Sequence, residues 1–98
     1  MPPIYQKKGL FYFDPNDPIY QDHFPGRPVV PGSLIVAAFL KVVEQEEIEP
    51  TAIKRFRFKK FVIPGTYAYQ MVIATGMIDC TLLQRKETFA TGKILYGG

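Results

Sequence analysis

Residues 22–40 read DHFPGRPVVPGSLIVAAFL, and this stretch decides the fold because a stiff loop turns directly into a helix within it. Its first half holds the chain's only histidine, His23, together with three of the nine prolines and two of the eight glycines. Prolines and glycines favour an irregular loop, whereas Ser33 is a favoured helix N-cap. We therefore predict a helix from Leu34 to about Glu46, which must end before Pro50.

The start of this helix is also a candidate site. Backbone N–H groups at a helix start have no acceptor inside the helix, so they point at whatever lies beyond it. His23 adds a titratable imidazole to the same loop. A base beside hydrogen-bond donors is the combination that carbonyl chemistry uses, because the donors can stabilise an oxyanion. A lone histidine is more often structural than catalytic, so the surrounding motif decides its interpretation.

Residues 23–34, HFPGRPVVPGSL, resemble the signature of the β-hydroxyacyl-acyl carrier protein dehydratases of the FabZ and FabA type. The motif fixes one histidine, three prolines and two glycines at set spacings. Residues 56–65 are similar to the family's strand after the helix, which ends in Pro-Gly. The resemblance covers about residues 10–82. It implies the hotdog fold, an α+β architecture in which an antiparallel sheet wraps around one central helix, and it implies a dimer.

The resemblance also implies roles for individual residues. His23 would remove the proton alpha to the thioester carbonyl, and Gly32 would donate its backbone N–H to the thioester oxygen. The backbone carbonyl of Val29 would hold the histidine tautomer. The substrate-binding positions implied around them are Phe24, Gly26, Val29, Pro31, Ser33 and Leu34. The substrate would be a β-hydroxyacyl or enoyl thioester of acyl carrier protein or coenzyme A, in fatty-acid or polyketide-type metabolism.

One position departs from the family's pattern. The family carries Glu or Asp five residues after the second glycine of the motif, where this chain has Ala37. That acid protonates or holds the departing hydroxyl, and it comes from the other subunit's helix across the dimer interface. Glu44 shares the helix face of Ala37 but lies roughly 10.5 Å further along the axis, beyond side-chain reach. We expect Ala37 to be a small buried helix residue.

The missing acid leaves several functions open. General acid catalysis is typically worth ~10²–10⁴-fold, so we predict that a homodimer of this chain is a weak or inactive dehydratase. It could instead be a noncatalytic thioester-binding subunit, a heterodimer partner of an acid-bearing relative, or an acyl thioesterase.

The rest of the chain reads as strands and turns. The length of 98 residues predicts a single domain, residues 1–98. Because so short a chain buries only a modest fraction of its surface, we expect oligomerisation to add to its hydrophobic core. Aromatic and β-branched residues in period-two patterns predict strands, with a turn at Asp14–Pro18 after the first of them. The predicted strands are Tyr5–Phe13, Ile53–Ile63, Tyr67–Thr75, Met77–Gln84 and Thr88–Tyr96.

Basic residues gather at 54–60, although the net charge is only +3. Period-two spacing predicts that Arg55, Arg57 and Lys59 project to one side while Phe56 and Phe58 face the core. A solvated strand face is the plainest interpretation. The functional one is docking of an acidic acyl carrier protein, with Arg27 of the signature as a further contact. Nucleic-acid binding is the least favoured alternative, because the aromatic rings should face the core rather than stack on bases.

The remaining composition excludes several classes of function. One cysteine, Cys80, excludes an internal disulfide and fits a reducing cytosol, so we expect a cytoplasmic location. The N-terminus has no charged start followed by a long apolar segment, so we expect no signal peptide. The longest apolar run, Leu34–Leu40, is too short to span a bilayer. One histidine and one cysteine do not form a metal site, and no glycine-rich phosphate loop is present, so we expect neither metal nor cofactor.

Overall fold

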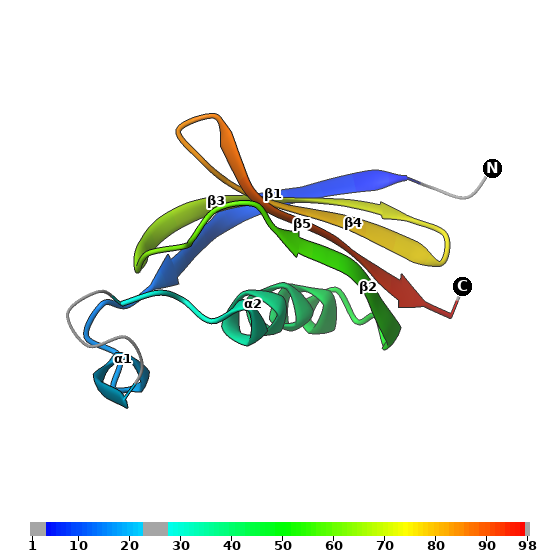
Figure 1. Cartoon of the computed structure of the whole chain (residues 1–98). Helices are drawn as coiled ribbons and strands as arrows, with labels where there is room; N and C mark the ends of the chain where they lie inside the picture. The colour runs from blue at the N-terminus through cyan, green and yellow to red at the C-terminus, as the bar shows by residue number, and fades with distance from the viewer. Residues whose placement is uncertain (1–3, 23–27, 98) are drawn as a thin grey trace.

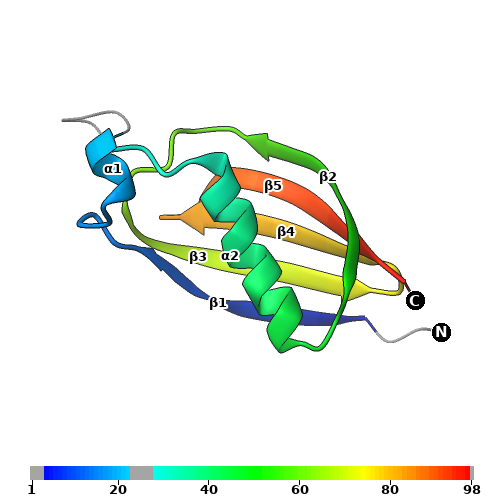
Figure 2. The ribbon, with the colours of Figure 1, turned by 90° about the horizontal axis from the view of Figure 1, so that it is seen from below.

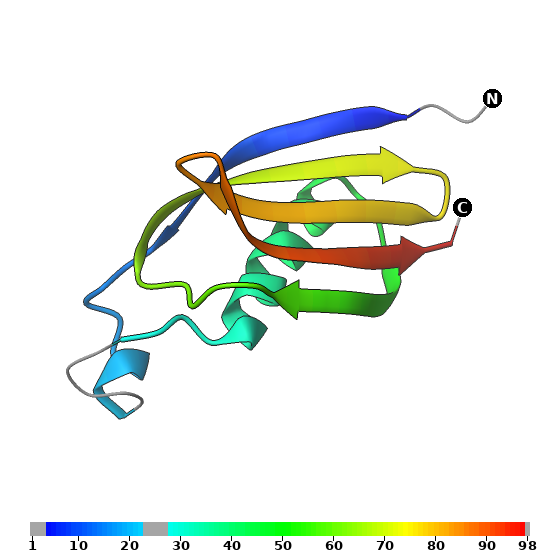
Figure 3. The same cartoon turned by 45° about the horizontal axis from the view of Figure 1, so that its top comes forward.

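The computed structural model describes residues 4–22 and 28–97. Within them the elements run β1 (Tyr5–Phe13), α1 (Ile19–Asp22), α2 (Gly32–Gln45), β2 (Pro50–Phe58), β3 (Gly65–Ala74), β4 (Met77–Gln84) and β5 (Glu87–Tyr96). The strands form one antiparallel sheet in the order β1-β3-β4-β5-β2 (Figure 3). The sheet curves over α2, which lies along one of its faces (Figures 1 and 2). The predicted α+β architecture, an antiparallel sheet around one central helix, is confirmed.

Alternation along the central strands builds the core. On β3 the side chains of Tyr67, Tyr69, Met71 and Ile73 are buried, as their period-two spacing predicts. The residues between them face the other side of the sheet. We call the side that packs on α2 the inner face, and the opposite side the outer face. The buried residues that β4 and β5 add to the inner face are Ile78, Cys80, Leu82, Ala90 and Ile94.

Only one side of α2 is covered by the sheet. The buried residues follow helical spacing: Ile35, Phe39, Val42 and Val43. The opposite side is exposed along its length, at Ser33, Ala37, Lys41 and Glu44. The apolar run at residues 34–40 therefore does not mean that the helix is buried on every side. Small residues such as alanine supply helix propensity on an exposed side as well as packing on a buried one.

The two ends of α2 are fixed by the backbone. Pro31, not Ser33, is the N-cap, and its carbonyl accepts the N–H groups of Leu34 at 3.0 Å and Ile35 at 3.3 Å. Ser33 lies inside the first turn, and no side chain of a described residue caps this end. The predicted cap was therefore two residues too late. At the other end, the N–H of Ile48 reaches the carbonyl of Val43 at 3.2 Å, which is the outer bond of a Schellman motif.

Strand β2 differs most from its prediction. A regular strand was expected to run to Ile63, but β2 ends at Phe58. Its pairing with β5 also shifts register between Lys54 and Arg57, and Arg55 has a positive φ of 55°. An extra residue is therefore bulged out of the strand at this point, which breaks the expected period of two. Elsewhere the strand bounds agree within two residues, while the short helix α1 was not predicted.

Candidate functional site

Two loops meet at the start of α2. The N–H of Val30, in the loop before the helix, donates to the carbonyl of Val62 at 2.7 Å. Both valine side chains are buried, so this contact anchors the C-terminal half of the signature stretch to the β2–β3 loop. The two segments run close together in both views of the ribbon (Figures 1 and 2). The start of α2 is thus held by core packing and by a backbone hydrogen bond.

Gly32 is the first residue of α2, as the predicted donor role requires. No described residue accepts a hydrogen bond from its N–H. A Cβ at this position would lie 2.8 Å from the Phe58 ring, so only glycine lets the ring approach the helix this closely. The donor therefore sits at the positive end of a helix of 14 residues, beside an aromatic ring.

An apolar cleft of about 430 Å³ lies at this end of the molecule. It is lined by residues of three loops: Pro15, Pro28, Val29, Phe61, Ile63 and Pro64. Two of these side chains are strongly exposed, Phe61 at 84% and Ile63 at 61%. Val29, a predicted binding residue, is among the lining residues. Exposed apolar side chains gathered in one cleft are typical of a binding surface for an apolar ligand or a partner.

Ala37 is exposed, not buried as expected. It lies on the uncovered side of α2, one turn after Ser33, because the sheet packs against the side that carries Ile35 and Phe39. The first helical residue, Gly32, lies about 7.5 Å from it along the axis. Within one chain, the position that holds the family's acid therefore faces outward.

The predicted site residues are only partly described. His23, Phe24, Gly26 and Arg27 lie outside the described residues, so their predicted roles stay predictions. Val29, Pro31, Gly32, Ser33 and Leu34 come together at the start of α2, with Ser33 exposed and the others half-buried.

The predicted docking cations separate into two groups. Lys59 begins the β2–β3 loop, where its N–H donates to the carbonyl of Phe89 at 2.8 Å. Arg55 and Arg57 instead line a cleft on the outer face of the sheet. Arg57 pairs with Thr91, which alternates with the inward-facing Ala90. These two arginines therefore lie across the sheet from α2.

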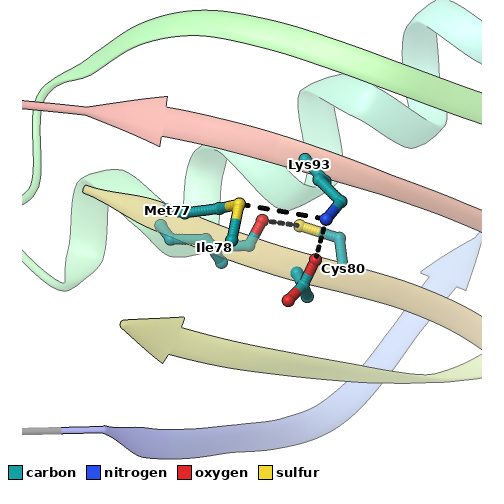
Figure 4. Close-up of polar contacts among 5 residues, drawn as sticks. Met77, Ile78, Cys80 and Lys93 are labelled. Atoms are coloured by element: carbon teal, nitrogen blue, oxygen red, sulfur yellow. Dashed lines mark hydrogen bonds and ion pairs between the residues drawn. The ribbon is translucent and has the colours of Figure 1, made fainter. Parts of the chain in front are cut away.

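Cys80 is an inert residue of the core. Burial, with the negative charge of Asp79 as a second cause, raises the pKa of its thiol to about 12. Its Sγ–H points at the carbonyl of Ile78, 4.0 Å away (Figure 4). A thiol with this pKa is not a thiolate near neutral pH, so Cys80 is no nucleophile.

The described residues show neither a metal site nor a membrane-spanning helix. Among residues 4–22 and 28–97, no three His, Cys, Asp or Glu side chains come close enough to hold a metal ion. None of the helices in those ranges has the length and apolar character needed to cross a membrane.

Three residues that lie at this site were not predicted as site residues from the sequence. Phe58 was expected in the core, yet it is 45% exposed and lies against Gly32. Phe61 and Ile63 were assigned to a strand, and both line the apolar cleft. The Pro64-Gly65 break indicated that a loop was near. No pattern indicated that two apolar side chains just before it face outward.

Comparison with known families settles the relationship. The model of the ApeI-like family, described as the ApeI dehydratase, matches residues 6–93. The chain belongs to the ApeI-like dehydratase family. It is also similar to the 3-hydroxyacyl-(acyl-carrier-protein) dehydratase FabZ of Caldicellulosiruptor saccharolyticus, at 41% identity over 82 residues. That alignment covers 74% of this chain and 56% of the relative.

Other relatives agree with this placement. The FabZ of Geobacter metallireducens is 36% identical over 73 residues, covering 62% of this chain and 49% of the relative. The ApeI-like chain thus spans about half the length of the curated relatives it matches. A solved structure described as the dehydratase heterocomplex ApeI:P from Xenorhabdus doucetiae superposes with a TM-score of 0.71 at 18% identity. It covers 95% of this chain and 88% of that one, and it confirms the hotdog fold.

Proposed function

We propose that residues 1–98 form a single hotdog domain that binds a β-hydroxyacyl or enoyl thioester at the start of α2. The observation that carries the proposal is the Gly32 N–H, which has no acceptor among the described residues and lies at a helix start. The apolar cleft at the same end of the molecule is suited to an acyl chain. Membership of a dehydratase family, and relatives described as acyl-carrier-protein dehydratases, support this class of substrate.

The proposed chemistry divides between described residues and the signature loop. Gly32 would donate to the thioester oxygen, where negative charge develops when the alpha proton leaves. His23 would accept that proton, and the carbonyl of Val29 would hold its tautomer. Departure of the β-hydroxyl as water needs a further proton, which Ala37 cannot supply. We therefore infer that the chain binds the thioester well and dehydrates it slowly or not at all unless another carboxylate is present.

A second subunit is the natural source of that carboxylate. The exposed side of α2, which carries Ser33 and Ala37, is free to pack against another chain. In a homodimer the partner again offers alanine. A heterodimer with an acid-bearing relative would supply the carboxylate, and a similar structure is described as a dehydratase heterocomplex. We propose that this chain is active in such a pair, and that acyl carrier protein docks near Arg27 and Lys59. A cytoplasmic location stays a prediction.

The binding step is tested with a matched pair of variants. Gly32→Pro removes the N–H but is tolerated at the first helical position, whereas Gly32→Ala keeps it. Both add a Cβ that meets Phe58. We expect Gly32→Pro to bind an enoyl coenzyme A thioester about five- to tenfold more weakly than Gly32→Ala by calorimetry, the value of one lost hydrogen bond. Equal affinities of the two variants would remove Gly32 from the proposal.

Catalysis is tested by turnover. The purified chain is assayed on β-hydroxyacyl thioesters, alone and co-expressed with a FabZ-type relative that carries the acid. We expect slow or no turnover by the chain alone and turnover about 10²-fold or more faster in the mixed complex. The substitution His23→Gln in this chain should abolish that gain. Failure to form a mixed complex, or a gain independent of His23, would contradict the heterodimer.

A further inference from the structure

A second cleft lies on the outer face of the sheet, across from α2. Its volume is about 390 Å³, and it is formed where β4, β5 and β2 run side by side. We call it the outer cleft. Its lining side chains on this face are Arg55, Arg57, Asp79, Thr81, Thr91 and Lys93. None of the residues that line the apolar cleft near Gly32 belongs to it, so the two sites are separate.

The bulge of β2 creates the outer cleft. Lys54 pairs with Lys93, so continued regular pairing would place Arg55 opposite Gly92 and Arg57 opposite Ala90, on the inner face. The register shift instead pairs Arg57 with Thr91, on the outer face. Arg55 takes the left-handed conformation, which non-glycine residues rarely adopt, and it also lines the cleft. Backbone strain of this kind is often retained at functional sites.

The packing partner of the bulge is on the inner face. The ring of Phe56 covers Gly92 so closely that any Cβ there would collide with it. Phe56 therefore points towards α2 and contacts the rings of Phe39 and Phe58. As a result, no aromatic side chain from the described part of the chain lines the outer cleft. Nucleic-acid bases would have no stacking platform there.

The outer cleft has an excess of positive charge. Lys93 pairs with the carboxylate of Asp79 at 3.5 Å, and its Nζ also lies 3.9 Å from the sulfur of Met77 (Figure 4). The side chains of Arg55 and Arg57 make no hydrogen bond or ion pair with a described residue. Three cations thus face one carboxylate. Unneutralised like charges in one cleft repel each other, and an anion would remove that repulsion.

We propose that the outer cleft binds a diphosphate group, either free or as part of a phosphate ester. A guanidinium presents a planar fork of N–H donors that matches phosphate oxygens in pairs, and two guanidinium groups suit two phosphates. Thr81 and Thr91 are direct cross-strand partners, and their hydroxyls add donors to the same wall. The volume lies at the lower end of small-molecule sites, which fits a compact anion rather than a protein segment.

The test measures binding of inorganic pyrophosphate to the full chain by amide chemical shifts and calorimetry, with acetate as the control anion. We expect shifts at Thr81 and Thr91, and affinity about tenfold lower in Arg57→Gln, as expected for lost charge-assisted hydrogen bonds. Arg55→Gln should act in the same direction. Lys8→Gln is the matched control, because Lys8 is exposed on β1 and lies outside the cleft. This substitution should change the affinity less than about twofold, because the charge of Lys8 is distant from the cleft and screened by salt.

A variant with the opposite effect sharpens the test. Asp79→Asn removes the carboxylate that repels an anion and frees Lys93, so it should bind pyrophosphate about threefold or more tightly. Binding of ADP with the same residue dependence assigns the cleft to diphosphate esters, and binding of pyrophosphate alone assigns it to the free anion. The proposal would be overturned if pyrophosphate bound no more tightly than acetate. It would also be overturned if the same arginines bound only a single-stranded oligonucleotide or an acidic protein. These readouts do not involve the thioester site.

Discussion

Replacing Gly92 by alanine tests the packing that holds the β2 bulge. A Cβ at Gly92 would lie closer than 3.0 Å to atoms of the Phe56 ring. The ring cannot easily withdraw, because its centroid lies 6.0 Å from that of Phe39 and 6.4 Å from that of Phe58. Overpacking of a core typically costs ~1–3 kcal/mol, while the stiffer unfolded chain returns ~0.4–1 kcal/mol. We expect a net loss of about 1–2 kcal/mol in the free energy of unfolding.

Thermal denaturation measures this loss. For a chain of 98 residues the entropy of unfolding is about 0.2 kcal/mol/K, so Tm should fall by roughly 5–10 °C. Gly97→Ala is the matched control, because no atom lies within 4 Å of its added Cβ. Its Tm should stay within about 2 °C of wild type.

A double-mutant cycle isolates the contact itself. Phe56→Leu removes the ring that collides with the new Cβ, so it should recover part of the loss when combined with Gly92→Ala. We expect a coupling energy of about 1 kcal/mol or more. A Gly92→Ala variant as stable as wild type, or two substitutions that simply add, would refute the inferred packing.

Two further predictions concern stability. Because burial raises the pKa of Cys80 to about 12 from its ordinary 9.0, the stability that the neutral thiol contributes is full below pH 9.0 and is lost as pH rises towards 12. Between about pH 7 and about pH 10.5 in urea titrations, wild type should therefore lose about 2 kcal/mol more than Cys80→Ala, and equal losses would contradict this. Glu47 follows α2 with a positive φ of 59°, where glycine is favoured, so Glu47→Gly should raise Tm by about 5 °C. Glu49→Gly, at an exposed position without a positive φ, should not raise it.

The regular part of the fold was predictable because its signals are local. The bounds of β1 and β4 agree with the sequence prediction, since the Asp14–Pro18 turn and Gly76 mark their limits. In the turn, the Asp14 carboxylate accepts the N–H of Asn16 at 2.9 Å, a local bond that the residue type favours. Gly76 has a φ of 77°, as a tight turn between β3 and β4 requires.

The bulge was not predictable because its cause is not local. Alternating Arg and Phe at residues 54–60 reads as a regular strand, and no glycine marks the left-handed position at Arg55. The partner that accommodates Phe56 is Gly92, which lies 36 positions later in the chain and across the sheet. In the sequence, Gly92 is only a glycine within the predicted last strand. Cross-strand packing of this kind appears only when the two strands are aligned.

The candidate site divides in the same way. The helix start at Gly32 follows from local proline and glycine signals, and the structure places Gly32 there. The exposure of Ala37 depends on which side of α2 the sheet covers, and an apolar run such as residues 34–40 does not encode that side. The identity of Ala37 is plain in the sequence, but its outward position is a property of the tertiary fold. That position is what makes a second subunit relevant to the chemistry.

The most direct test of the functional proposal is to restore the acid. Ala37→Glu is compatible with the fold because the side chain is exposed on α2. We predict that the variant dehydrates a β-hydroxyacyl thioester about 10²-fold or more faster than wild type, that the non-acidic Ala37→Gln gives no gain, and that adding His23→Gln removes it. The dehydration rate of Ala37→Glu relative to wild type is the deciding number. An equal rate, with wild type already fast, would contradict the conclusion that this subunit lacks its catalytic acid.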